Sequence, residues 1–416
     1  MQNRTEYLDA VCEQIRFKAA RKSIKCELGA HIDDRIAEGK TEEQAIAVMG
    51  DAFQTGQALN RIHKPRFEWR VVLCMLLLSA MSAALSVMTT KYGSYVLSES
   101  LFYEIIRPMI QAFFLMAVLY FFNYALLRKL RFFFYTVSML YLIAYILMYD
   151  PFNDNIWLAQ TPVIILSTLA LILGMVGLVS KGFKNRVVNL VVLSLLSIVS
   201  ITLVSLVMFE NALLLSFVYV FVFIVAKWKN RKQQWMDMAV YSIVLIAAFV
   251  ICTQLFDEGQ YAFISKIENS HYTDINAMLQ KAKLIGSSTI NLGFGLPSSR
   301  IHYVITAIIG AYGWLAGIGA TLIAGALCTF MLRRSLRVAH SYGRLLSAGI
   351  SVFFTTRVVL LILTNIGVID GAFSMPFLSF GRYEYLSDAI LMGIFLSVWR
   401  RSTFMSDEAK VLMKET

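Results

Sequence analysis

A series of apolar runs restricts the fold more than any other feature, because each is close to the length that crosses a lipid bilayer. A helix of about 20 apolar residues spans the hydrocarbon core of a membrane. We expect about ten such helices, of which the sixth and the tenth are the shortest. The predicted spans are 71–90, 107–127, 132–149, 161–180, 187–208, 212–226, 236–256, 303–331, 345–367 and 386–399. The sequence therefore predicts an all-α, polytopic membrane protein.

Composition agrees with a membrane location. The chain has 58% hydrophobic and 16% charged residues, whereas soluble domains carry about 25% charged residues. The net charge of +11 is spread in small clusters between the apolar runs, which is not the pattern of a nucleic-acid-binding surface. The five cysteines show no CxxC spacing, so we predict no disulfide framework and no zinc site. No other cofactor is predicted, and a divalent cation is left open.

The N-terminal segment differs from the rest of the chain, because its apolar residues recur at helical spacing among charges. Thr41, followed by Gln44 three residues later, has the signature of a capping box. Asp51 is a second candidate helix cap. We predict three parts, namely a small cytoplasmic helical domain over 1–66, a transmembrane domain over 67–401 and a cytoplasmic tail over 402–416.

The basic residues between the runs predict the orientation. With the N-terminal domain in the cytoplasm, eighteen Lys and Arg residues lie in the cytoplasmic connections and tail, against six in the outer connections. The positive-inside rule then places both termini in the cytoplasm. The outer connection over 257–301 is too polar to span and too long for a simple turn. We expect its amphipathic pieces to lie on the membrane surface or cover a cavity at the outer face.

The C-terminal third resembles the SEDS proteins, the FtsW, RodA and SpoVE group. The resemblance rests on 365–369 (NIGVI), 375–381 (MPFLSFG) and 393–397 (GIFLS), with 343–350 (GRLLSAGI) opening the preceding helix. Ten helices, a long outer loop and cytoplasmic termini also fit that family. Residues 1–64 resemble a separate module, the permease-prefix type of helical domain.

The resemblance implies a glycosyltransferase of the bacterial plasma membrane that polymerises lipid II for cell shape, division or sporulation. Family members usually work beside a class B penicillin-binding protein, among membrane lipids. In the family a carboxylate before helix eight is thought to take the proton from the acceptor hydroxyl, as a general base. Aligning 297–303 on that motif puts His302 at the position of the carboxylate. An imidazole can also act as a base, so His302 is the candidate catalytic residue. The alternative is that the site has lost its chemistry and His302 lines a polar vestibule.

Five residues are candidates for binding the lipid diphosphate. Arg357 lies midway along the ninth run, where a guanidinium either grips a diphosphate or forms a structural ion pair. Asp370, Glu384 and Asp388 are its candidate counter-ions. Arg300, Lys281 and Lys283 are further candidates, which could steer an anionic substrate or form a solvated face. Ser379 is the last candidate, and it either contacts a lipid headgroup or only stabilises its turn.

Two further functions stay open. One is a non-catalytic SEDS paralogue that binds the lipid-linked precursor or scaffolds a partner. The other is a flippase that carries lipid II across the membrane.

Overall fold

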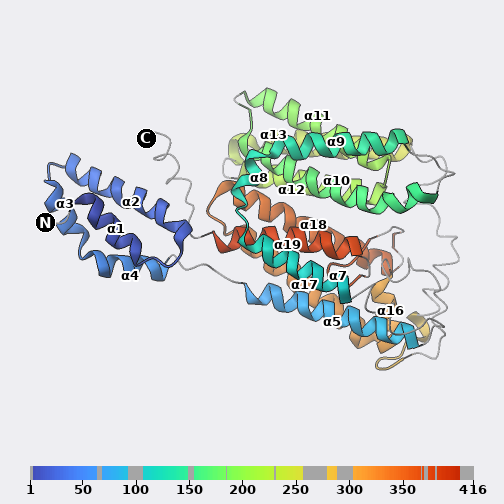
Figure 1. The fold of residues 1–416 in the computed structure, drawn as a ribbon. Coiled ribbons are helices and arrows are strands. Elements are labelled where there is room, and N and C mark those ends of the chain that lie inside the picture. Colours follow the sequence, from blue (N-terminus) through green and yellow to red (C-terminus); the bar gives the residue numbers. More distant parts are fainter. Residues whose placement is uncertain are drawn as a thin grey trace.

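The structure is a computed structural model, and most of its described residues form helices, which turns and loops connect (Figure 1). It describes residues 3–62, 68–91, 106–148, 154–183, 185–228, 231–255, 279–287, 303–366, 368–369, 373–379 and 382–402.

The first four helices form a bundle with a hydrophobic core of their own, at one end of the molecule (Figure 1). They are α1 (Arg4–Glu13), α2 (Lys18–Ala37), α3 (Glu42–Met49) and α4 (Ala52–Ile62). The predicted capping box is confirmed: the N–H of Gln44 donates to Thr41 Oγ1 (3.4 Å) and the N–H of Thr41 donates to Gln44 Oε1 (3.2 Å). The Asp51 carboxylate accepts the N–H of Gln54 (2.9 Å). Each cap pairs an N–H group that the helix itself leaves without a partner.

The rest of the described chain consists mainly of apolar helices. Their bounds are α5 (Trp69–Lys91), α7 (Arg107–Phe121), α8 (Ala125–Lys129), α9 (Arg131–Met148), α10 (Asp154–Lys181), α11 (Arg186–Ser205), α12 (Phe209–Lys227), α13 (Arg231–Leu255), α16 (Val304–Tyr312), α17 (Trp314–Ser335), α18 (Ser341–Asn365) and α19 (Arg382–Arg400). By length and composition, seven described helices can cross a membrane, and two shorter apolar helices accompany them. The chain is a polytopic helical membrane protein, as predicted.

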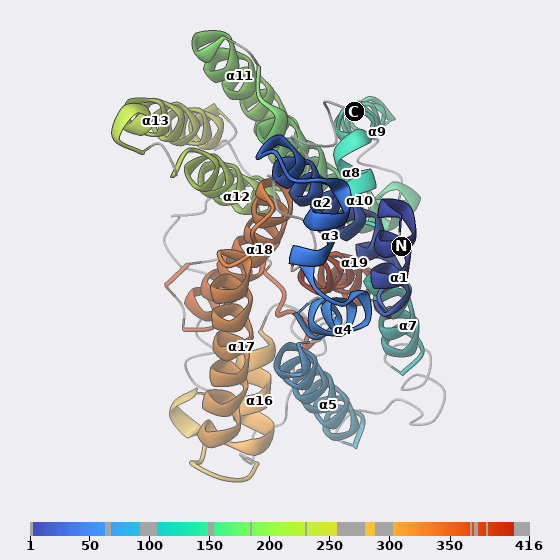
Figure 2. The ribbon, with the colours of Figure 1, turned by 90° about the vertical axis from the view of Figure 1, so that its left-hand side faces the viewer.

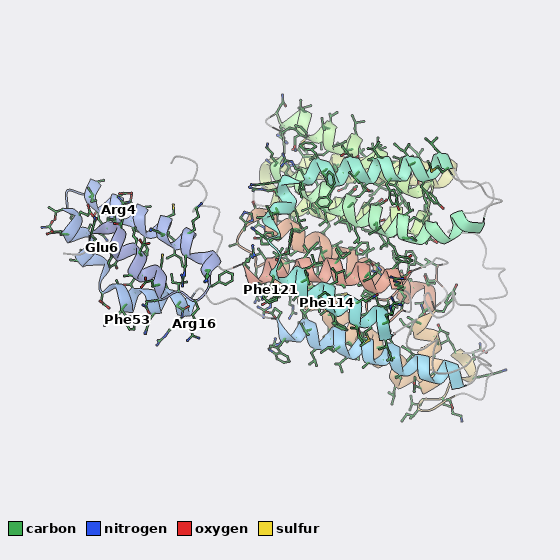
Figure 3. All side chains as sticks on the ribbon, viewed as in Figure 1. Arg4, Glu6, Arg16, Phe53, Phe114 and Phe121 are labelled. Carbon is green, nitrogen blue, oxygen red and sulfur yellow. The ribbon has the colours of Figure 1, made fainter. Side chains whose placement is uncertain are left out.

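Exposed apolar side chains mark the surface that faces lipid. Phe114 and Phe121 of α7 are 71% and 63% exposed (Figure 3). They lie seven residues apart, about two helical turns, and so share one face of the helix. A large aromatic stripe of this kind is costly in water and favourable in a bilayer.

α18 lies at the centre of the membrane helices. It packs against α10, α12, α16, α17 and α19. Figures 1 and 2 show α9 to α13 on one side of it and α5, α16 and α17 on the other. Because α18 contacts neighbours on several sides, a charged residue in its middle must find a partner within the protein.

Arg400 connects the two sets of helices. Its guanidinium lies over the ring of Phe17, between α1 and α2, at 5.3 Å from the centroid. It also lies over Tyr120 (4.9 Å) and Phe121 (4.6 Å) of α7. The C-terminal end of α19 is therefore at the end of the membrane helices that faces the N-terminal bundle, and its beginning is at the opposite end.

The prediction of one helix over 303–331 is wrong, because Gly313 separates α16 from α17. Gly313 has φ of 94°, a conformation that favours glycine. The segment 279–287 packs at the break: the N–H of Trp314 donates to the carbonyl of Lys283 (3.0 Å), and the N–H of Gly286 donates to the carbonyl of Tyr312 (3.0 Å). These bonds satisfy backbone groups that an interrupted helix exposes. The apolar composition continues through the break, so periodicity could not reveal it.

Gly393 lies where α19 packs closely against α7, and we predict that Gly393→Ala destabilises the protein. A Cβ there would lie 2.6 Å from Leu119 Cβ and 3.1 Å from the carbonyl oxygen of Met116. Neither atom can swing aside, so the helices must separate, and overpacking of this kind costs about 1–3 kcal/mol. The measurement is the thermal unfolding midpoint of the detergent-purified protein.

Gly319→Ala in α17 is the matched control, since a Cβ at Gly319 would meet nothing within 4 Å. Alanine has a better helix propensity than glycine by about 1 kcal/mol, so this variant should unfold at the wild-type temperature or above. Equal midpoints for the two variants would refute the packing argument.

Candidate functional site

Arg357 forms a buried ion pair with Asp388. Its Nη1 lies 2.5 Å from Asp388 Oδ1, and the two residues are only 5% and 1% exposed. Its Nη2 donates to Ser374 Oγ. The guanidinium also lies over the ring of Phe353, one turn earlier in α18, at 5.4 Å. Asp388 is one of the three predicted counter-ions, and another of them, Asp370, lies outside the described residues.

The same carboxylate secures the turn before α19. Asp388 Oδ2 accepts the N–H of Phe377 (3.1 Å), whose φ of 59° is unusual for a residue with a side chain. Ser379 Oγ accepts the N–H of Met375 (2.6 Å), and Ser379 is buried. The Pro376 ring fixes the backbone between them. The structure therefore places Ser379 inside the turn, and its contact with a lipid headgroup stays a prediction.

A cavity of about 80 Å³ opens beside this ion pair. Its described lining combines apolar side chains with Arg357, two glutamates and several hydroxyl or amide groups. The lining residues are Ile164, Ile165, Thr168, Leu169, Met208, Glu210, Asn211, Leu214, Phe353, Arg357, Phe373, Ser374, Glu384 and Ser387. They come from α10, α12, α18, the turn over 373–379 and α19. Glu210 and Glu384 begin α12 and α19, so the cavity lies at the end opposite the N-terminal bundle.

The cavity brings one guanidinium and two carboxylates together. The guanidinium can donate to phosphate oxygens, and a carboxylate can accept a proton from a sugar hydroxyl. Glu210 lines the cavity although the sequence did not predict it as a site residue. It is the only acidic residue in the run from 186 to 228, and an isolated acid among apolar residues is a sign of a functional position in a membrane protein.

The beginning of α16 is attached to the C-terminal end of α18. Thr306, four residues after His302, donates its N–H to the Asn365 side-chain oxygen (3.0 Å), and its hydroxyl donates to the same oxygen (3.0 Å). Both residues are buried. This pair ties the described end of the predicted catalytic motif to α18, the helix that carries Arg357.

The other predicted site residues are not all described. His302 and Arg300 lie outside the described residues. Lys281 and Lys283 are exposed and belong to the segment that pairs with the start of α17. They are not among the described residues that line the cavity. Over the same part of the chain, no group of three or more His, Cys, Asp or Glu residues is placed to hold a metal ion.

The comparisons with known proteins agree on one fold. No protein-family model matches the chain. A chain from the structure titled "Structural coordination of polymerization and crosslinking by a peptidoglycan synthase complex" aligns with a TM-score of 0.60 and 18% identity, over 81% of this chain and 98% of that one. The Thermus thermophilus Rod shape determining protein RodA aligns with a TM-score of 0.56 and 16% identity, over 80% and 97%. The chain has the SEDS fold.

A sequence relative supports this assignment over a shorter stretch. The probable peptidoglycan glycosyltransferase FtsW of Trichlorobacter lovleyi is 29% identical over 114 residues, which are 25% of this chain and 28% of that protein. The match thus spans little more than a quarter of the relative. A single-site variant of Thermus thermophilus RodA gives a TM-score of 0.58 at 16% identity, over 80% of this chain and 98% of that one. The predicted resemblance to the SEDS proteins is confirmed by the shared fold and by this relative.

Proposed function

We propose that this SEDS-fold protein binds lipid II, or a related undecaprenyl-linked sugar, and joins its sugars into glycan. The observation that carries the proposal is the fold shared with RodA along 97% of the RodA chain. A second support is the polar cavity beside Arg357, since a charge buried among membrane helices usually marks a substrate or ion site.

The proposed reaction needs a base, a grip on the leaving group and a shielded site. The hydroxyl of one sugar attacks the anomeric carbon of another, and the bond from that carbon to the lipid diphosphate breaks. His302 takes the hydroxyl proton, as its position in the family motif implies. Arg357 and Arg300 hold the diphosphate.

The location follows from the charge pattern and the fold. We place the protein in the bacterial plasma membrane, with both termini in the cytoplasm by the positive-inside rule. The cavity beside Arg357 then opens toward the outer face. A class B penicillin-binding protein is the proposed partner, supported by the peptidoglycan synthase complex among the structural neighbours.

A non-catalytic role is the second candidate, and His302 is the observation that favours it. A neutral imidazole cannot supply the negative charge that a carboxylate gives to a cationic transition state or a metal. Arg357 is in addition already paired with Asp388. In this version the protein binds the lipid-linked precursor or scaffolds its partner.

The test is an assay of the purified full-length protein, with its class B partner, on labelled lipid II. We expect glycan polymer, resolved by length on a gel. Lipid II that stays bound to the protein without polymer would select the non-catalytic role. Transfer of labelled lipid II between the leaflets of vesicles would select the flippase. The proposed function would be overturned if the protein neither bound lipid II, nor formed polymer from it, nor transferred it between the leaflets.

A further inference from the structure

A second cavity lies at the other end of the membrane helices, between α5 and α17. Its volume is about 240 Å³, and the two helices pack against each other (Figure 2). The described lining residues are Glu68, Arg70, Phe330, Arg333, Arg334 and Arg337. Since α5 begins here and α17 ends here, the cavity faces the side of the N-terminal bundle (Figure 1).

The charges of this cavity do not balance. Arg334 Nε pairs with Glu68 Oε1 (3.1 Å), and its guanidinium lies over the Trp399 ring at 4.9 Å. Glu68 is the only carboxylate among the described lining residues. The other three arginines, Arg70, Arg333 and Arg337, are exposed. The cavity is therefore strongly positive and open.

Its position along the helices directs it toward lipid. On α5, Leu73 and Leu77 follow Arg70 by three and seven residues and are 45% and 44% exposed. On α17, Leu322 is 68% exposed and lies eleven residues before Arg333, close to three turns. Arg70 and Arg333 therefore lie at the ends of the exposed apolar faces of α5 and α17, which face lipid.

An exposed tryptophan marks the depth of the cavity. Trp69, next to Arg70, is 59% exposed, and the Arg70 guanidinium lies 5.7 Å from its ring centroid. Tryptophan gathers where the hydrocarbon core meets the headgroups. The cavity is therefore at headgroup level, with apolar helix surface directly beyond it.

We propose that this cavity binds the phosphate headgroup of an anionic phospholipid from the leaflet on the side of the N-terminal bundle. Arginine forks suit phosphate oxygens, and basic pockets between membrane helices are sites for anionic headgroups. The acyl chains lie along the stripes of α5 and α17. The bound lipid bridges α17 to α5, the first membrane helix after the N-terminal bundle. This site is separate from the cavity beside Arg357 and does not depend on the proposed function.

The test uses native mass spectrometry of the full-length protein in detergent, titrated with phosphatidylglycerol or phosphatidylcholine. We expect the wild type to bind phosphatidylglycerol more tightly. The double variant Arg333→Gln, Arg337→Gln leaves the Arg334–Glu68 pair intact and should bind phosphatidylglycerol about 25-fold more weakly, because each basic residue near an anionic surface contributes about fivefold. Its affinity for phosphatidylcholine should not change. If the double variant does not fold, the single variant Arg70→Gln should weaken the binding of phosphatidylglycerol about fivefold.

The matched control is Lys129→Gln, Lys181→Gln, which removes two charges at the same end of the helices, where both lysines are exposed. It should retain wild-type affinity for phosphatidylglycerol. An equal loss of affinity for phosphatidylglycerol in the two double variants would show a general charge effect and would overturn the proposed site. Displacement of phosphatidylglycerol by inorganic phosphate at the same concentration would also overturn it, since the cavity would then recognise a free anion.

Discussion

Asp388→Ala should lower the stability of the protein by about 3–5 kcal/mol, the usual cost of removing one partner from a buried ion pair. The substitution leaves the Arg357 guanidinium buried among apolar helices without its carboxylate. It also removes the acceptor for the N–H of Phe377. The measurement is the unfolding midpoint in detergent, followed by tryptophan fluorescence. A wild-type midpoint would refute a stabilising ion pair.

Two variants separate the ion pair from a general effect of charge in α19. Glu384→Gln alters a carboxylate one turn earlier, partly exposed at the cavity, and should cost far less. The double variant Arg357→Met, Asp388→Ala removes both charges, so it should recover much of the stability lost by Asp388→Ala. If Arg357 also grips a diphosphate, the double variant will regain stability and still fail to bind lipid II.

His302→Ala should lower glycan polymerisation by about 10²–10⁴-fold if His302 is the base, the range that a positioned general base contributes. The readout is the initial rate of polymer formation from labelled lipid II. Binding of lipid II should change little, because the base acts on the proton in the transition state. His31→Ala is the control, since His31 lies exposed on α2 of the N-terminal bundle.

His302→Asp completes the series, because it restores the carboxylate that the family places there. If the imidazole of His302 is the base in an active wild type, the polymerisation rate of His302→Asp should not exceed that of the wild type. Polymer that forms only in His302→Asp would identify a non-catalytic paralogue. A His302→Ala variant with full activity would remove His302 from the mechanism.

The predictions that succeeded rest on local patterns. The Thr41 capping box needs only residues three positions apart, and the membrane helices need only long apolar runs. The polar site required more than local pattern. Three carboxylates were candidates for Arg357, and sequence spacing could not choose among them. Asp388 makes the contact because it lies one turn further into α19 than Glu384, on the face that packs toward α18.

By itself, the sequence determined that the chain is a polytopic helical membrane protein, since its apolar runs can be buried only in lipid or against one another. It also determined the SEDS pattern of the C-terminal third. The tertiary structure alone decided that Gly313 breaks the eighth run, that Glu210 joins Arg357 at one cavity, and that four arginines gather between α5 and α17. The physical reason is that local composition sets where a helix can form, whereas ion pairs and cavities depend on side chains that only packing brings together.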